Sequence, residues 1–181
     1  MRFTFPAALI VVALATAAQA GQSILTIAGP DVSPNRDAVT QETPGFFKYH
    51  EVTFENGAAL DLEALEAMGM REIIGKLPGT DLTVAYSGPP LMDVLKATRK
   101  EGSGALPEII SVMALDGYAA DIAVADIEAH NAILATRVDG EPMGIGDLGP
   151  TMVVFEMPDD AEKAGTLGDA QVWSAFFIRV Q

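Results

Sequence analysis

The feature that most constrains this chain is a pair of apolar runs, residues 109–115 and 118–124, separated only by Asp116-Gly117. Two apolar runs joined by Asp-Gly are the strongest short-range signal for a β-hairpin. They favour a type I′ turn, which has positive φ at both central residues. We therefore expect a hairpin here, with Asp116 and Tyr118 flanking its turn.

A second Asp-Gly pair, Asp139-Gly140, follows the apolar run 133–138 and predicts a second turn of the same type. Pro142 lacks the backbone N–H that an interior strand donates, so the strand after this turn is expected at a sheet edge. Both turns connect antiparallel strands, which indicates a β-rich fold.

Short strands and a few helices account for the rest of the chain. Asp61 can cap a helix that Gly69 ends, and Pro89-Pro90 opens a second helix. A polar segment between the last two strands is expected as a loop or a helical turn. The sequence therefore predicts an α+β fold, a β-rich mixed-sheet domain with two or three short helices. The remaining strands are expected at residues 24–28, 50–54, 71–76, 82–86, 151–156 and 173–180, with a turn at Asn56-Gly57.

The first twenty residues have the pattern of a secretory signal peptide. Arg2 supplies a cationic start, residues 7–18 are almost all apolar, and Ala18-Gln19-Ala20 is a small-x-small cleavage site. The apolar run is too short for a membrane span, which needs roughly 20 apolar residues. We therefore predict a signal peptide over residues 1–20, a single domain over 21–181, export by a Sec-type route, and a periplasmic protein without a membrane anchor after cleavage.

Composition excludes several kinds of chemistry. The 181-residue chain has no cysteine, which rules out thiolate zinc sites, iron–sulfur clusters and a catalytic thiol. Its formal net charge is −14, and cleavage of the predicted signal would remove Arg2 and make it one unit more negative. Such a chain repels nucleic acid and anionic lipid, so we expect neither as a partner.

One motif matches a nucleotide fingerprint literally, because residues 144–149 read Gly-Ile-Gly-Asp-Leu-Gly. The dinucleotide site needs a strand before this motif and a helix N-terminus after it. Here Pro150 and a β-rich run follow, so we do not predict a nucleotide site.

The histidines and the tryptophan are interpreted as structural. His50 and His130 are the only histidines, and a metal site would need both to converge with carboxylates such as Glu51 or Asp126. Neither histidine has a second one at ligand spacing, so we predict no metal ligand. Trp173, the sole tryptophan, is expected as a core anchor at the start of the last strand.

The order of several short segments resembles the oxidoreductase molybdopterin-binding domain, which has the sulfite-oxidase-like fold. The resemblance extends over residues 24–180 and is most distinctive from residue 87 to residue 150. It rests on Tyr-Ser-Gly-Pro-Pro-Leu at 86–91, Asp-Val-Leu at 93–95, Val-Met-Ala-Leu-Asp-Gly-Tyr at 112–118, Asp-Ile at 121–122, Ile-Leu-Ala at 133–135, Asp-Gly-Glu-Pro-Met at 139–143, Gly-Pro at 149–150 and Val-Trp at 172–173.

The chain also departs from that family. Family enzymes bind molybdenum through a cysteine before the Gly-x-x-Leu passage, and the corresponding residues 73–77 include none. Family members also tend to have an arginine after the Gly-Pro step, where this chain has Thr151. They usually leave the cytoplasm folded, by the twin-arginine route, whereas this signal has one arginine. Basic residues that could meet a pterin phosphate are few: Lys76, Arg99, Lys100 and Arg137.

Two functions stay open, besides a purely structural role in the envelope. The resemblance and its departures imply a non-catalytic periplasmic domain, sensory or accessory, that binds a small molecule or an envelope protein partner and holds no cofactor. The alternative is a molybdopterin-dependent oxidoreductase that keeps its cofactor without a cysteine ligand. The resemblance puts Ser87, Asp116, Tyr118 and Asp121 beside the family's cofactor cleft, so these are the candidate ligand-binding residues, and their carboxylates favour a cationic or hydroxyl-rich ligand.

Overall fold

The computed structural model describes residues 21–181, which form a mixed α+β, sheet-rich domain. The predicted signal peptide, residues 1–20, lies outside the described residues. Within residues 21–181, none of the helices combines the length and the apolar character that crossing a bilayer requires.

The main sheet has five strands in the order β2-β1-β11-β5-β6. β1 runs parallel to β11, and the other neighbours are antiparallel. Every residue of β1 is buried, and β11 is buried along almost its whole length, as expected for central strands covered on both faces. The strands are β1 (Leu25–Ala28), β2 (Gly57–Leu60), β5 (Ile109–Ala114), β6 (Ala119–Ala123) and β11 (Ala175–Val180).

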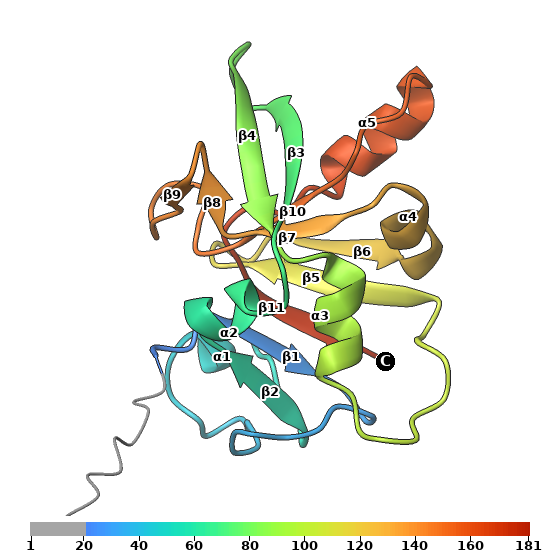
Figure 1. The fold of residues 1–181 in the computed structure, drawn as a ribbon. Coiled ribbons are helices and arrows are strands. Elements are labelled where there is room, and N and C mark those ends of the chain that lie inside the picture. The colour runs from blue at the N-terminus through green and yellow to red at the C-terminus, as the bar shows by residue number, and fades with distance from the viewer. Residues whose placement is uncertain (1–20) are drawn as a thin grey trace, which may run out of the picture.

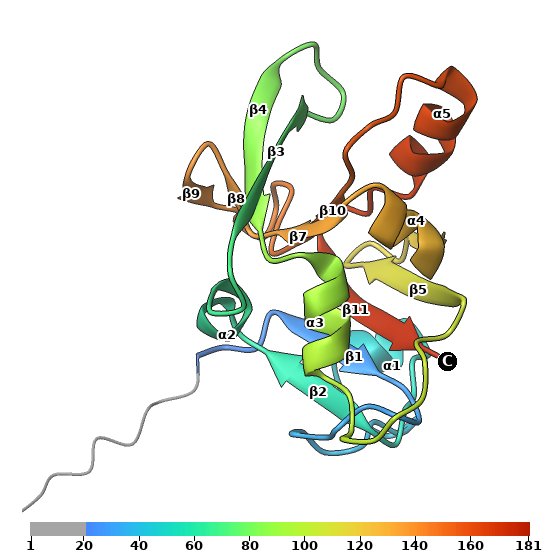
Figure 2. The same ribbon diagram turned by 45° about the vertical axis from the view of Figure 1, so that its right-hand side comes forward.

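Helices cover one face of this sheet and phenylalanines the other. Leucine and isoleucine side chains of four helices join the larger core: α2 (Leu62–Glu66), α3 (Leu91–Ala97), α4 (Val124–Ala129) and α5 (Ala161–Asp169). α3 lies across the front of the sheet, and α1 (Phe46–Tyr49) lies behind it (Figures 1 and 2). There Phe47 packs with Phe54, Phe176 and Phe177, and this second cluster stabilises the back of the sheet.

A second sheet, in the order β3-β4-β8-β9, projects from the body (Figure 1). Its root packs on a strand pair, β7 (Ile133–Ala135) with β10 (Met152–Val154), through a core that includes Ile73 and Tyr86. β9 is an edge strand, as Pro142 predicted. The strands are β3 (Arg71–Lys76), β4 (Thr83–Gly88), β8 (Arg137–Val138) and β9 (Glu141–Pro142).

The two Asp-Gly turns differ. Asp139 and Gly140 have φ of 48° and 82°, and Val138 pairs with Glu141, so the second turn has the predicted type I′ form. The first hairpin is present, but its predicted type I′ turn is wrong. Gly117 has φ of 95° and Asp116 does not share a positive φ. The Gly117 N–H donates to the Ala114 carbonyl at 3.0 Å, which makes a three-residue loop.

Two further expectations are corrected. The predicted strand at residues 50–54 is wrong: only Phe54 makes an isolated bridge, to Val39, and the strand β2 begins at Gly57, where a turn was expected. The Val52 and Phe54 side chains pack in the aromatic cluster, and this burial explains their alternation with polar residues. The described residues contain five short helices rather than two or three, because α1 and α4 were not predicted and the polar segment before β11 forms α5.

Candidate functional site

The cleft at the tip of the β5–β6 hairpin is the candidate site. It has a volume of about 460 Å³ and lies where the hairpin tip meets α1, the loop after β9 and the segment before β11. Its lining is half apolar and includes two carboxylates. The lining residues are Phe46, Leu115, Asp116, Ile145, Gly146, Asp147, Trp173 and Ser174.

Asp116 is held at the cleft by the turn itself. Its Oδ1 accepts the Tyr118 N–H at 2.9 Å, and the Ala114 N–H donates to the Tyr118 carbonyl at 2.8 Å. A side chain that bonds the backbone two residues on is typical of aspartate in turns. The carboxylate is exposed and is therefore available to a ligand from solvent.

The loop over residues 144–149 forms the opposite wall. Gly144 accepts hydrogen bonds from the N–H groups of Asp147, at 3.3 Å, and Gly149, at 3.1 Å. Gly146 has φ of 103°, a conformation that suits glycine alone. This folding presents Ile145 and Asp147 to the cleft.

Ser174 connects the two walls. Its N–H donates to the Leu148 carbonyl at 2.7 Å, and its own carbonyl accepts the Leu115 N–H at 3.0 Å. Ser174 has φ of 51°, which is uncommon for a residue other than glycine and costs free energy that the surrounding bonds must offset. A register shift in the β5–β11 ladder follows directly, between Ala175 and Phe177. Such bulges occur often beside binding sites because they redirect a side chain.

His50, at the C-terminal end of α1, fixes the third wall. Its Nε2–H donates to the Leu115 carbonyl at 3.0 Å, since a carbonyl can only accept. The imidazole stacks on Phe46 with ring centroids 6.2 Å apart, and it lies against Gly117, where an added Cβ would come within 3.1 Å of Cε1. The imidazole therefore locks α1 to the hairpin turn.

The chemistry of the cleft suits an organic cation. Phe46, Trp173 and Ile145 are 57%, 46% and 72% exposed, although large apolar side chains are usually buried. Tyr49, beside His50, is 80% exposed. None of the eight lining residues, all within the described part of the chain, is Lys or Arg. Aromatic faces attract cations through the ring quadrupole, and the two carboxylates add charge attraction.

The structure separates the four residues that the resemblance singled out. Asp116 lines the cleft. The Tyr118 hydroxyl donates to the Asp169 carbonyl at 2.8 Å, at the end of α5, and Asp121 accepts a hydrogen bond from Ser111 on β5. Ser87 lies in the second sheet, opposite Glu72 and Arg137. We therefore rebuild the candidate site around Asp116 alone.

Trp173 corrects a further expectation. It was predicted as a core anchor, but it is half exposed and lines the cleft, because the chain bends at Ser174 before β11 begins. Sequence reasoning also missed Phe46, Ile145 and Asp147. The glycines of residues 144–149 were the available signal, because they mark a loop with unusual backbone angles rather than a nucleotide site. β10, not a helix, follows that loop in the structure.

The histidines do not form part of a metal cluster. His130 lies at the C-terminal end of α4, and Asp126 pairs with Lys163 at 2.6 Å. Across residues 21–181, no group of three or more His, Asp or Glu side chains could hold a metal ion.

Three of the four basic side chains that the resemblance would bring to a pterin phosphate, Lys76, Arg99 and Arg137, are paired with carboxylates. Residues 73–77, which the resemblance matches to the family's cysteine-bearing stretch, form the last four residues of β3 and the residue after it. Their only charged side chain, Lys76, pairs with Asp81 at 3.2 Å. Arg137 is bonded to Glu66 at 2.7 and 3.0 Å, an interaction that lowers the pKa of the Glu66 carboxyl and raises the pKa of the guanidinium.

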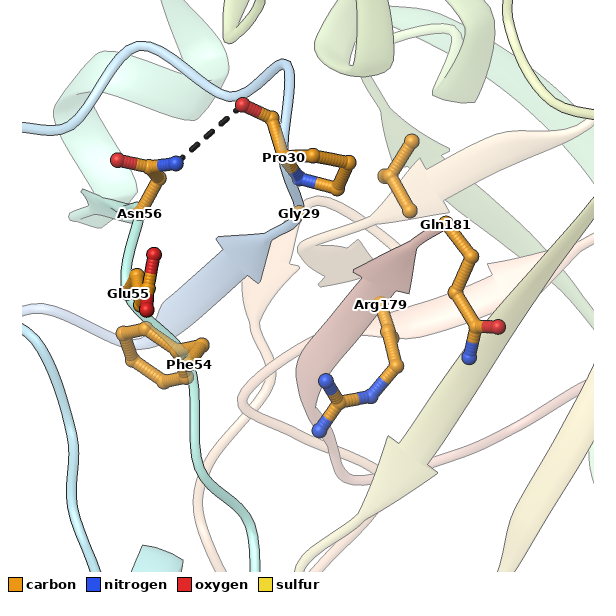
Figure 3. Close-up of a pocket in the computed structure, with 8 residues that line it drawn as sticks. Gly29, Pro30, Phe54, Glu55, Asn56, Arg179 and Gln181 are labelled. Carbon is orange, nitrogen blue, oxygen red and sulfur yellow. Dashed lines mark hydrogen bonds between the residues drawn. The ribbon is translucent and has the colours of Figure 1, made fainter.

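A second cleft, of about 460 Å³, lies where Arg179 and Gln181 meet the segments after β1 and before β2. Figure 3 shows the residues that line it. Two of its polar side chains, Asn56 and Arg179, are used by the fold. Asn56 donates to the Pro30 carbonyl at 3.3 Å, and the Arg179 guanidinium donates to the Thr53 carbonyl at 3.3 and 3.4 Å. We assign these side chains to holding the sheet margin together rather than to a ligand.

No protein-family model matches this chain, and no curated protein matches it either.

Proposed function

We propose that this chain is an exported, periplasmic, non-catalytic binding domain that takes a small organic cation, such as a quaternary ammonium or a guanidinium compound, in the Asp116 cleft. One observation carries the proposal: exposed Phe46 and Trp173 line the same cleft as two carboxylates, and the lining has no cationic side chain. The secretory signal pattern of residues 1–20 supports the location. The sequence resemblance to the molybdopterin-binding domain supports a descent from that fold with loss of the metal chemistry.

The walls of the cleft favour binding over catalysis. Each wall is held by backbone bonds or by a side chain that the fold already uses, as with His50 on the Leu115 carbonyl. A pre-formed site of this kind loses little conformational entropy when it binds a ligand. Its carboxylates supply charge attraction, and its aromatic rings supply a surface without hydrogen-bonding demands, which together select cations with apolar substituents.

Calorimetric titration with choline tests the proposal, because its neutral isostere 3,3-dimethylbutan-1-ol has the same shape without the charge. We expect choline to bind and the alcohol to bind at least roughly tenfold more weakly, because the alcohol lacks the charge interactions. Free arginine and an arginine-ended peptide distinguish a soluble ligand from a partner's side chain. Equal binding of choline and its isostere, or preference for an anion such as sulfate, would contradict the proposal.

Variants locate the site. Trp173→Ala is expected to weaken choline binding roughly 3- to 30-fold, the range of a single cation–π contact. Asp116→Asn removes one charge while keeping the turn bond to Tyr118. Glu101→Gln, in the exposed loop before β5, is the matched control and should leave binding unchanged.

Metal analysis tests the non-catalytic part. We expect protein purified from its own periplasm to contain no molybdenum and to show no sulfite- or sulfoxide-dependent redox activity, because the chain has no thiolate to hold the metal. Molybdenum near one atom per chain would establish the alternative, an oxidoreductase that holds its cofactor without a cysteine ligand.

A further inference from the structure

β3 forms a free edge of the projecting sheet. In the part of the chain that the structure describes, β3 pairs with β4 on one side and is the terminal strand of the order β3-β4-β8-β9 on the other. Figures 1 and 2 show the β3–β4 hairpin standing away from the main body. A terminal strand carries a row of unpaired N–H and C=O groups that can pair with another strand.

The register identifies which groups face outward. The Leu77 N–H donates to the Leu82 carbonyl at 2.8 Å, so residues 77 and 82 are a hydrogen-bonded pair of the antiparallel ladder. Such pairs alternate along the ladder with pairs whose backbone groups point away. The residues of β3 that direct N–H and C=O to the free edge are therefore Glu72, Ile74 and Lys76.

The neighbouring strand agrees with this assignment. Ala85 and Ser87 lie opposite Ile74 and Glu72 on β4, and by the same alternation their backbone groups point away from β3. The Ala85 carbonyl accepts the Asp139 N–H at 2.8 Å, and the Ser87 carbonyl accepts the Thr136 N–H at 2.9 Å. Both partners lie on the far side of β4, beside β8.

The side chains of the same three residues share one face, because they alternate along the strand. Glu72, Ile74 and Lys76 are all exposed, and Ile74 is 62% exposed. Lysine at a sheet edge normally discourages pairing with another chain. Here glutamate, isoleucine and lysine follow in that order, so the face is complementary to itself when read antiparallel.

We propose that β3 pairs with β3 of a second copy of this chain, antiparallel and centred on Ile74, to give a two-fold symmetric dimer. In this register Ile74 lies opposite Ile74, and each Glu72 lies opposite the Lys76 of the other copy. All three pairs fall on positions whose backbone groups already face the edge, so each pair exchanges both hydrogen bonds. The two projecting sheets become one sheet across the dimer, with the same patch used twice.

Other registers fit less well. Centring the pairing on Glu72 places glutamate opposite glutamate, and centring it on Lys76 places lysine opposite lysine, and like charges directly opposite destabilise a sheet. Centring on residue 73 or 75 places Ile74 opposite a charged side chain. The existing Lys76–Asp81 pair does not compete strongly, because its side chains are 67% and 104% exposed and such surface pairs contribute little.

Charge exchange tests the proposal by sedimentation velocity on the processed chain. We expect a concentration-dependent dimer for the native sequence. Glu72→Lys and Lys76→Glu each turn two attractive pairs into two repulsive ones, so each should weaken dimerisation roughly tenfold or more. The double variant E72K/K76E restores opposite charges in every pair and should restore the dimer.

Ile74→Pro provides a second block, because it removes only the outward N–H and leaves the β3–β4 ladder its own bonds. Glu101→Lys makes the same charge change as Glu72→Lys at a loop position and should not affect the dimer. A monomer at every concentration would overturn the proposal. A dimer that survives the single charge changes, or a double variant that stays monomeric, would also overturn it. The site for cations lies elsewhere, so choline binding is expected to be the same in all these variants.

Discussion

The two Asp-Gly turns carry the same dipeptide and have different structures and surroundings. At Asp139-Gly140 both residues have positive φ and the turn projects at the outer end of the second sheet. At Asp116-Gly117 only the glycine has positive φ, and the turn lies in the candidate site against His50 and beside Ser174. The local sequence therefore determines that the chain reverses, while the neighbours determine how.

The segments beside the two turns form different hydrogen bonds with the backbone. β5 pairs with β11 as well as β6, and the Leu115 N–H is committed to the Ser174 carbonyl at 3.0 Å. That bond extends the interaction with the β11 segment past the end of β5 and leaves three residues to make the reversal. β8 likewise pairs with β4, and the Asp139 N–H donates to the Ala85 carbonyl at 2.8 Å, but β9 is the edge strand of its sheet. The intrinsic preference of Asp-Gly for a two-residue turn therefore prevails there.

Among the variants that compare the two turns, Gly117→Ala is expected to lower the free energy of unfolding most. Alanine at φ of 95° is strained, and its Cβ would lie 3.1 Å from Cε1 and 3.2 Å from Nδ1 of His50. The two costs together predict a loss of about 2–3 kcal/mol in the free energy of unfolding, measured by urea denaturation.

The background variant His50→Ala separates the two costs. If the imidazole accounts for part of the loss, Gly117→Ala should cost about 1 kcal/mol less in that background. Equal losses in both backgrounds would show that backbone strain alone makes the first turn sensitive.

Gly140→Ala should have a smaller effect. This glycine has φ of 82°, but no other atom lies within 4 Å of the added Cβ, so strain is the only cost. We expect a loss of about 1 kcal/mol by the same denaturation measurement. A loss as large as that of Gly117→Ala would mean that the surroundings do not distinguish the turns.

The sequence predicted what depends on local preference. The hairpins, the helices opened by Asp61 and Pro90, and the edge position forced by Pro142 all follow from capping, turn chemistry and a missing N–H. It did not predict what depends on distant contacts. Residues 50–54 alternate like a strand because Val52 and Phe54 pack among phenylalanines, and Trp173 is exposed because Ser174 turns the chain.

The site shows the same division. Asp116 was named because the resemblance put its hairpin turn beside a cofactor cleft, whereas Phe46, Ile145 and Asp147 reach the cleft from two other segments. Ser87, Tyr118 and Asp121 were grouped with Asp116 by resemblance, and their hydrogen bonds tie them to other parts of the fold. Periodicity along one chain segment carries no information about which distant segments meet.

Lowering the pH should destabilise the contacts of the second turn more than those of the first. The Arg137 guanidinium joins Glu66 to the Gly140 carbonyl, which accepts from Nη1 at 3.0 Å, and its hydrogen bonds hold the pKa of the Glu66 carboxyl below its ordinary value of 4.5. A depressed pKa means stabilisation that is present above the ordinary value and lost as pH falls through the folded value. Glu66→Gln should therefore be less stable than the native chain at neutral pH, and the difference should shrink as pH falls below 4.5, the ordinary pKa of this carboxyl. A constant difference down to pH 2 would contradict this linkage.

Asp139→Asn should change the free energy of unfolding least of all these variants. Comparing it with Asp116→Asn tests whether the charge in the cleft attracts the ligand. Asp139 accepts the Ala85 N–H at 2.8 Å through Oδ1, and an asparagine Oδ1 can accept the same bond. Asparagine is also favoured at the first central position of a type I′ turn, so stability should change by less than about 0.5 kcal/mol. Asp116→Asn likewise keeps the bond from the Tyr118 N–H and should be equally mild in denaturation. The two changes remove the same charge from the same Asp-Gly dipeptide, but only Asp116 lines the cleft. Choline binding should therefore fall for Asp116→Asn and stay at the native level for Asp139→Asn. If both variants lost choline affinity equally, the attraction for choline would come from the chain's overall negative charge rather than from the cleft.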